Sequence, residues 1–337
     1  MALFSRRPKD SSGSKGNAAD VAADAPAETD VPVADAPATT TSAVPISVSS
    51  FGGLGATAPQ VEPRRAARAA TQLAPAATET IPGLRDNVLV REALARVGDG
   101  VTSRALLDVA RQMLQGHLFL RVKGDARALL AEGKELPLAM VTVGDRRFAL
   151  AYSSGASLQA SVRADGDADT SAMGQPVLLV LRHVLKGTYD GLILDQASAP
   201  SRAVLPKDLL KKIVEKVDES LSVKTFLAGE RTPATAAAVA DALTRVPLWV
   251  AVGKVADGRP GIAEGRSEDG ARFLEVYSHP LEVAVMGRGD QAAPLTGRQL
   301  AGALASDTGL AGVIVDPAGP WIRLSRDDLA PLLALAD

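Results

Sequence analysis

The sequence has three histidines and no cysteine, and this limits the metal and nucleophile chemistry that the chain can carry. His117, His183 and His279 lie far apart in the sequence, so none stands at a metal-ligand spacing from another. Without cysteine there is no disulfide, no thiolate nucleophile and no thiolate metal site, which excludes sulfurtransferase chemistry and fits a reducing compartment. We therefore predict no metal and no cofactor.

Ser278 and His279 are the pair that most resembles a nucleophile with its base. They are neighbours in the sequence, at the end of a predicted strand, and adjacent residues on an extended chain point to opposite faces. The chain also contains no G-x-S-x-G elbow. The sequence therefore predicts no hydrolase triad and no catalytic residue.

Residues 53–58 fit the G-x-G-x-x-A spacing of a dinucleotide-binding loop, after a strand-like stretch at residues 44–48. Such a loop must lead into a helix whose N-terminus binds the pyrophosphate. Pro59 and Pro63 prevent that helix, and no βαβ pattern surrounds the glycines. We interpret this match as accidental and predict no nucleotide site.

Two aspartates, Asp195 and Asp316, each follow a glycine and three aliphatic residues. The second begins Asp316-Pro317-Ala318-Gly319, an order that suits a tight turn because aspartate bonds its own backbone and proline presets φ. We expect each to turn a hairpin, and favour this over the alternative of an acid catalyst or a metal ligand.

Aromatic residues are few, 3% of the chain, and several recur in equivalent contexts. Tyr152 and Tyr277 each end a predicted strand, where a tyrosine usually buries its ring and leaves its hydroxyl in water. Trp249 occupies the place of Phe119 and is expected in the core. Trp321 lies on an outer hairpin and is the candidate for an exposed interaction hot spot, the alternative being a packed strand aromatic. The predicted interaction surface comprises Trp321, Arg323, Tyr277, Ser278, Tyr152 and Ser153.

The elements that position these residues are repeated along the chain. Four stretches recur in the same order, with shorter loops in the second copy: residues 102–122 with 232–252, 147–153 with 272–278, 191–195 with 312–316, and 205–208 with 324–327. The period is too long for a solenoid, so we interpret it as a duplicated domain.

Each copy is predicted to run helix, strand, strand, strand, helix, strand, strand, helix. Asp86 or Asn87, Thr102, Thr232 and Thr296 are candidate helix caps. This order predicts an α+β fold made of two tandem copies of a small α/β domain, each a mixed sheet packed by helices. The predicted domains are residues 84–217 and 232–337, joined by a linker at 218–231.

Residues 1–83 differ in composition from the rest, with 20 alanines and 8 prolines among the first 80 residues. Such a segment cannot bury enough apolar surface to offset the entropy of ordering, so we predict a disordered leader. No apolar stretch follows the basic start or approaches membrane-spanning length, which indicates a cytoplasmic protein without a membrane partner. A net charge of −2 argues against nucleic acid, and the few arginines of the leader predict at most weak, salt-sensitive anion binding.

The duplicated part, roughly residues 85–337, resembles the SseB family, named for the enhanced serine sensitivity protein of enteric bacteria. The resemblance lies in residues 272–278, 296–304, 312–317 and 324–329, with the same set in the first copy, except that Gln196 stands where Pro317 stands. It implies an α/β domain but carries over no catalytic or ligand-binding residue.

Our leading hypothesis is therefore a non-catalytic cytoplasmic protein that presents a surface to an unknown protein partner or small ligand. The family's serine-linked name suggests an alternative, an enzyme or regulator of amino-acid metabolism. Its histidine, lysine or carboxylate groups would have to meet between the two copies, where an apolar contact would argue against it.

Overall fold

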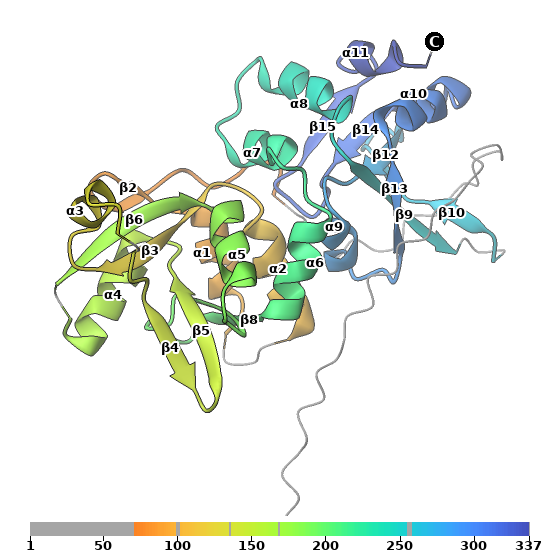
Figure 1. Cartoon of the computed structure of the whole chain (residues 1–337). Helices are drawn as coiled ribbons and strands as arrows, with labels where there is room; N and C mark the ends of the chain where they lie inside the picture. Colours follow the sequence, from red (N-terminus) through yellow and green to blue (C-terminus); the bar gives the residue numbers. More distant parts are fainter. Residues whose placement is uncertain (1–70, 99–101, 135, 168, 255–257, 337) are drawn as a thin grey trace, which may run out of the picture. The chain divides into compact units, whose positions relative to one another are not determined.

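The computed structural model describes residues 71–98, 102–134, 136–167, 169–254 and 258–336, shown in Figure 1. These residues all belong to one compact unit, residues 43–337. The predictions made for residues 1–70, namely the disordered leader and the 53–58 loop, lie outside the described residues. The fold is α+β, as the sequence predicts, and none of the described helices has the length and apolar character needed to cross a bilayer.

The first half contains a run of twelve elements after a short hairpin of β1 (Glu79–Ile81) and β2 (Leu84–Arg85). They are α1 (Val88–Ala95), α2 (Ser103–Gln112), β3 (His117–Lys123), α3 (Ala126–Ala131), β4 (Met140–Val143), β5 (Arg146–Ala151), α4 (Gly155–Asp165), β6 (Thr170–Pro176), α5 (Val177–Lys186), β7 (Gly191–Leu194), β8 (Ala203–Pro206) and α6 (Lys207–Glu215).

The second half repeats most of this order. Its elements are α7 (Ser222–Ala228), α8 (Thr235–Leu243), β9 (Leu248–Lys254), β10 (Pro260–Ile262), β11 (Glu264–Arg266), β12 (Arg272–Val276), α9 (Pro280–Val285), β13 (Gln291–Leu295), α10 (Gly297–Ser306), β14 (Leu310–Val315), β15 (Ile322–Ser325) and α11 (Ala330–Leu333).

The sheet pairing is the same in both halves, except that β10 adds a third strand beside β9 in the second half. A four-stranded mixed sheet runs β4-β5-β7-β8 in the first half and β11-β12-β14-β15 in the second, and in each its two middle strands are parallel. A second antiparallel pair, β3 with β6 or β9 with β13, joins it through an isolated bridge: Phe119 with Tyr152, and Trp249 with Tyr277. The duplication read from the sequence is therefore a duplication of register as well as of element order.

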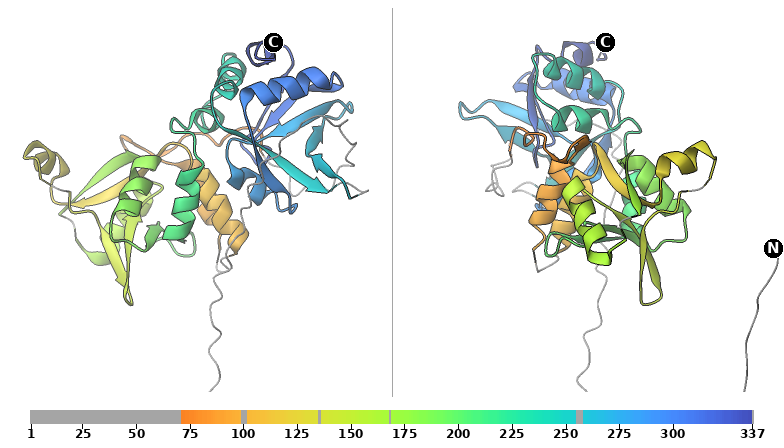
Figure 2. Two further views of the ribbon diagram at one scale, coloured as in Figure 1. Left: turned by 45° about the vertical axis from the view of Figure 1, so that its right-hand side comes forward. Right: turned by 90° about the vertical axis from the view of Figure 1, so that its left-hand side faces the viewer.

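Leucine, valine and alanine fill both cores, as the low aromatic content requires. In the first half, α1, α2, α5 and α6 pack on one face of the four-stranded sheet, and α4 packs on the other. In the second half, α7, α8, α10 and α11 lie on the equivalent face (Figure 1). Helix α9 crosses between the halves, because its Leu281 is buried in the core of the first and its Ala284 packs against that core. The helix lies against α2 (Figure 2).

Several local predictions need correction. The predicted linker, residues 218–231, contains helix α7, whose Val223 and Leu227 are buried in the second core. The predicted leader extends too far, because β1 lies within it and pairs with β2. Helices α3, α4 and α9 were not predicted. Thr232 does not cap a helix, since α8 begins at Thr235, whereas Asn87, Thr102 and Thr296 each accept a backbone N–H as predicted caps.

Candidate functional site

A buried group of charged residues lies where α2 of the first half meets the second half. We call it the seam cluster and define it as Arg111, Lys224, Ser278, Glu282 and Asp316. The carboxylate of Glu282, on α9, has no solvent exposure, and the Arg111 guanidinium lies 3.2 Å from it. Lys224, on α7, forms an ion pair with Glu282 and places its ammonium 3.5 Å from Asp316. These groups meet because α2 packs against α9 and the Lys224 side chain reaches Glu282 from α7.

Helix α2 also holds the hairpin turn that follows β14. Arg111 donates to the carbonyl oxygens of Gly319 at 2.6 Å and Ala318 at 3.2 Å, and Gln112 donates to Gly319 at 3.0 Å. The arginine thereby satisfies both backbone carbonyls and the Glu282 carboxylate, as a planar guanidinium with several donors can. The seam cluster therefore ties the two halves of the chain together.

Asp316 has a close counterpart in the first half. It accepts hydrogen bonds from the Ser278 backbone N–H at 2.8 Å and from the Ser278 hydroxyl at 2.6 Å. Asp195 accepts the same two donors of Ser153, the backbone one at 2.8 Å. Both aspartates have left-handed backbones, with φ of 51° and 52°. The prediction that each aspartate turns a hairpin is therefore confirmed, but each carboxylate bonds this serine where the sequence predicted a bond to its own backbone. In addition, each carboxylate secures the end of the neighbouring strand, a role that the sequence did not indicate.

Burial and charge set the protonation of this cluster. Burial by itself would raise the pKa of Glu282, but Lys224 and Arg111 outweigh it and hold that pKa below its ordinary value. Burial raises the pKa of Asp316 despite the nearby Lys224 ammonium. Burial also lowers the pKa of His279 to about 4. His279 is therefore neutral near pH 7; its Nδ1 caps α9 by accepting from the Leu281 N–H at 3.1 Å.

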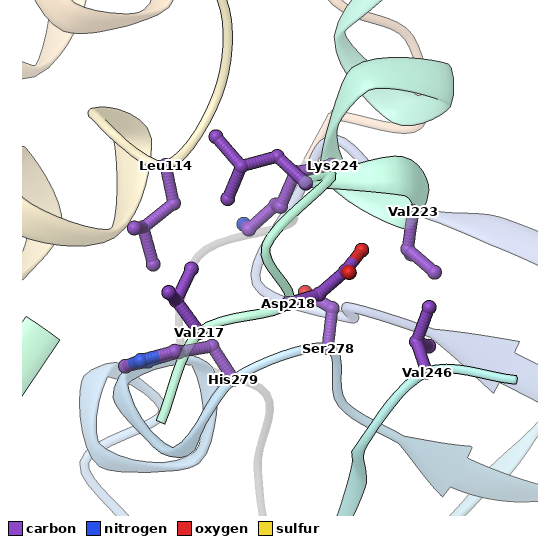
Figure 3. A pocket seen from close by; sticks show the side chains of 9 residues that line it. Leu114, Val217, Asp218, Val223, Lys224, Val246, Ser278 and His279 are labelled. Carbon is purple, nitrogen blue, oxygen red and sulfur yellow. The ribbon is translucent and has the colours of Figure 1, made fainter. Parts of the chain in front are cut away.

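The space beside the seam cluster is very small. Figure 3 shows the cavity between Lys224, Ser278 and His279, which is closed by apolar residues such as Leu114 and Val223. Its volume is about 10 Å³, which is room for a single water molecule. Ser278 donates to Asp316, while His279 bonds the Ile213 carbonyl, so the two do not form a nucleophile and base. The polar groups of the seam cluster thus form their hydrogen bonds and ion pairs with other groups of this protein.

A second, larger hollow lies on the outer face of the second four-stranded sheet and has a volume of about 190 Å³. We call it the Trp321 groove. It is lined by Arg266, Ser267, Phe273, Ile314, Pro317, Trp321 and Arg323.

The floor of the Trp321 groove is aromatic and its rim is cationic. The Phe273 side chain lies at the bottom, 7% exposed, and the Arg323 guanidinium stands 5.2 Å above its ring. Arg266 and Arg323 are exposed, and neither forms an ion pair with a residue that the structure describes. The Arg323 charge acts at a distance on Asp269, whose pKa is lowered mainly by a hydrogen bond from Ser267 and further by that arginine. The groove is thus suited to an anion.

Because the two halves share their strand register, this sheet face can be compared residue by residue with the equivalent face of the first half. Phe148 and Phe273 correspond, since each pairs with the glycine of a middle strand. The residue facing Phe148 across β4 is Val141, and its counterpart is Gly265. The residue facing Ile193 is Val204, whereas Arg323 faces Ile314. The groove therefore occupies a face that carries valines in the first half.

One further replacement opens the groove. In the first half Leu150 joins Phe119, Phe148, Tyr152, Leu158 and Ile193 in one apolar cluster. Its counterpart, Glu275, instead binds Arg288 and the Tyr277 hydroxyl. This polar group separates Phe273 and Ile314 from the cluster around Trp249. Phe273 and Ile314 therefore form a floor that α9 does not cover, because α9 has 6 residues where its counterpart α4 has 11.

Only part of the predicted interaction surface lies at this groove. Trp321, half-buried, and the exposed Arg323 line it, but Tyr152, Ser153, Tyr277 and Ser278 are buried and cannot form a surface. They are buried because the bridge to β3 or β9 and the Asp195 or Asp316 turn cover the strand end. The prediction of wet tyrosine hydroxyls is also wrong. The Tyr152 hydroxyl is 2.9 Å from Ser161, and the Tyr277 hydroxyl donates to Glu275 at 2.5 Å.

The remaining predicted residues have structural positions. Trp249 is buried in the core at the place of Phe119, as predicted. His117 Nε2 lies 2.7 Å from the Arg85 carbonyl, and its ring meets the edge of Phe119. Within the described part of the chain, no three histidine, aspartate or glutamate side chains gather in a way that could hold a metal ion. Arg266, Phe273 and Ile314 were missed, because only the sheet brings them beside Trp321.

No protein-family model matches this chain, and no curated protein or solved structure is significantly similar to it. The resemblance to the SseB family therefore stays a prediction.

Proposed function

We propose that this chain is a non-catalytic, cytoplasmic binding protein whose Trp321 groove takes an anionic partner. The observation that carries the proposal is the pair of arginines, Arg266 and Arg323, on the rim of an aromatic floor without an ion-pair partner among the described residues. Guanidinium groups bind carboxylates and phosphates through fixed pairs of donors, and tryptophan and arginine are both enriched in interaction hot spots.

The comparison of the halves supports this role. The same sheet face carries Val141, Leu150 and Val204 in the first half, and Gly265, Glu275 and Arg323 at the corresponding places in the second. Each of these changes makes the second face more polar or more open, and none is needed to keep the strands paired. We therefore place the binding site on this face of the second half, because it is where the second copy differs from the first.

The seam cluster has a supporting role in this proposal. It fastens α2 to the turn that carries Pro317 and leads into Trp321, through Arg111 and Gln112. A groove wall held by buried hydrogen bonds loses little conformational freedom when a ligand binds, so more of the contact energy is retained as affinity. We therefore treat the first half as the support of the groove in the second.

The second candidate function is a reaction of amino-acid metabolism at the seam, and one observation favours it. Lys224, Glu282 and Asp316 do meet beside Arg111 of the first half, where a purely apolar contact between the halves would have argued against an enzyme. The adjoining cavity of about 10 Å³ is far smaller than an amino acid, which disfavours it. Titration of L-serine into the chain and its Lys224→Met variant tests this candidate, because a seam enzyme must bind serine in a Lys224-dependent way.

Affinity capture with quantitative mass spectrometry tests the leading proposal. The wild-type chain, an Arg323→Gln variant and an Arg146→Gln variant serve as baits. Arg146 is the matched control, because its guanidinium stands 5.9 Å from the ring of Phe148 in the first half, outside the groove. We expect at least one partner to be lost with Arg323→Gln and retained with Arg146→Gln. Equal recovery of every partner by all three baits would contradict the proposal.

A further inference from the structure

We infer that the occupant of the Trp321 groove is an extended, acidic peptide segment of a partner protein. This inference rests on the proposed function and adds the class of ligand. It depends on three features of the groove: its length along the strands, its small depth, and the order in which its charged and apolar residues follow one another.

The length of the groove comes from the register of the sheet. Arg266 pairs with Arg272 at the start of β12, while Pro317 and Trp321 follow the last pair, Val276 with Val315. The groove therefore runs the length of β12, which has 5 residues and spans roughly 15 Å at about 3.3 Å per residue. A single small anion would bind one end only, whereas an extended segment of similar length matches the whole.

The depth of the groove argues against a small-molecule pocket. Its volume of about 190 Å³ is below the roughly 300 Å³ at which pockets for small molecules begin. Phe273 and Ile314 form a floor over which side chains can lie, but they do not enclose a ligand. Aromatic-lined grooves are known sites for extended peptide segments, and alternate side chains of an extended segment point to the same face.

The order of residues along the groove specifies the chemistry of the segment. A guanidinium stands at one end on Arg266, apolar groups follow on Phe273 and Ile314, and Arg323 lies beside them over the Phe273 ring. The cation–π contact with the ring restrains the Arg323 guanidinium, so it can pair with a carboxylate at a small entropic cost. The groove thus fits acidic side chains that alternate with aliphatic ones.

The two tryptophans of the chain provide a direct test, since Trp249 is buried in the core and Trp321 lies in the groove. The probe is an acetylated hexapeptide of alternating glutamate and leucine, added to the full chain with ¹⁵N-labelled indoles. We expect the Trp321 indole signal to shift with saturation and the Trp249 signal to stay. Arg323→Gln should weaken binding about tenfold, as expected for loss of about 1.4 kcal/mol, and Arg146→Gln should not.

Three further additions give the test its controls. A lysine–leucine hexapeptide, free glutamate and inorganic phosphate should each leave the Trp321 signal in place at the same concentration. If free glutamate or phosphate shifts it as strongly as the acidic peptide, the groove is a small-anion site; the inference is then overturned while the proposed function stands. If neither the acidic peptide nor any of the three control additions shifts the Trp321 signal, the inference is overturned. The capture experiment then decides separately whether the proposed function survives.

Discussion

The guanidinium of Arg111 lies 3.2 Å from the carboxylate of Glu282, although 171 positions separate them in the sequence. Both side chains are buried, and the pair joins α2 of the first half to α9 of the second. Glu282 stands at the third position of α9, where Ser157 stands in α4. The second copy therefore carries a buried charge that its counterpart lacks, and the chain supplies Arg111 and Lys224 to neutralise it.

Replacing Arg111 by methionine should destabilise the protein strongly. The change leaves Glu282 buried with one cation fewer, removes the Arg111 bond to the Ala318 carbonyl and leaves the Gly319 carbonyl with Gln112 as its side-chain donor. Removing one member of a buried ion pair typically costs about 3–5 kcal/mol. Urea unfolding should show this loss, while Arg245→Met, which breaks an exposed pair with Asp241, should leave the midpoint almost unchanged. Similar midpoints for the two variants would contradict the assigned role of the seam.

Stability should fall as the pH is lowered through the range set by His279. The pKa of His279 is about 4 in the folded chain and 6.5 in the reference state, because burial disfavours its charged form. The unfolded state thus binds more protons between these values, so stability is complete above about pH 6.5 and is lost toward pH 4. The loss attributable to this side chain is about 3 kcal/mol.

The His279→Ser variant isolates this effect. It places at the start of α9 the residue type that caps α4, Ser154, and removes the titrating ring. Unfolding followed at several pH values between 7.5 and 4.5 should show a flatter profile than in the wild type. The raised pKa of Asp316 acts in the opposite direction and remains in both proteins. An unchanged slope in the variant, or a flatter one after replacement of the exposed His183, would refute the assignment.

Filling the Trp321 groove from below should abolish ligand binding without unfolding the chain. A Cβ at Gly265 would lie 2.6 Å from Cδ1 of Ile314, the flexible end of a side chain that can move. Gly265→Val restores the residue found at the equivalent place, Val141, and should push Ile314 into the groove. We expect at least a tenfold weaker response to the glutamate–leucine peptide with a melting temperature close to that of wild type. Unimpaired binding would mean that the ligand does not touch Ile314.

The helix within the predicted linker should contribute to the stability of the second core. Leu227 of α7 is 1% exposed, and truncating a buried leucine to alanine typically costs about 2–5 kcal/mol. Its neighbour Phe226 is 37% exposed, so Phe226→Ala is the control and should cost much less. Chemical denaturation of both variants measures the difference. Equal effects would indicate that α7 is a tether and not part of the core.

Much of the fold could be predicted from local patterns. The tandem copies were visible because equivalent strands keep equivalent residues, such as Phe148 with Phe273. The hairpins could be placed because aspartate favours tight turns: Asp195 and Asp316 adopt left-handed backbones, and their backbone carbonyls accept from Ser198 and Gly319 within the turns. Thr102 and Thr296 marked their helices because a cap is satisfied within a few residues. These features need only neighbours in the sequence.

The candidate sites required contacts that no local pattern contains. Helix α7 is short and was read as a linker, since what orders it is the burial of Val223 and Leu227 among residues of other elements. The seam cluster combines α2, α7, α9 and a hairpin turn, and the charged residues in it look individually like surface residues. Most of the groove was missed for the same reason, because Arg266 and Phe273 meet Trp321 only across the sheet.

By itself the sequence determined that the chain repeats one α+β unit, where most strands and turns lie, and that thiolate chemistry is absent. These properties follow from side-chain periodicity, capping and composition, which act over a few residues. The tertiary structure decided which of the aromatic and charged residues near strand ends are on the surface and which are buried. Tyr277 and Trp321 are both aromatic residues near strand ends, yet one is sealed by a bridge to Trp249 and the other lines a groove. That difference arises because burial depends on what other segments cover each side chain.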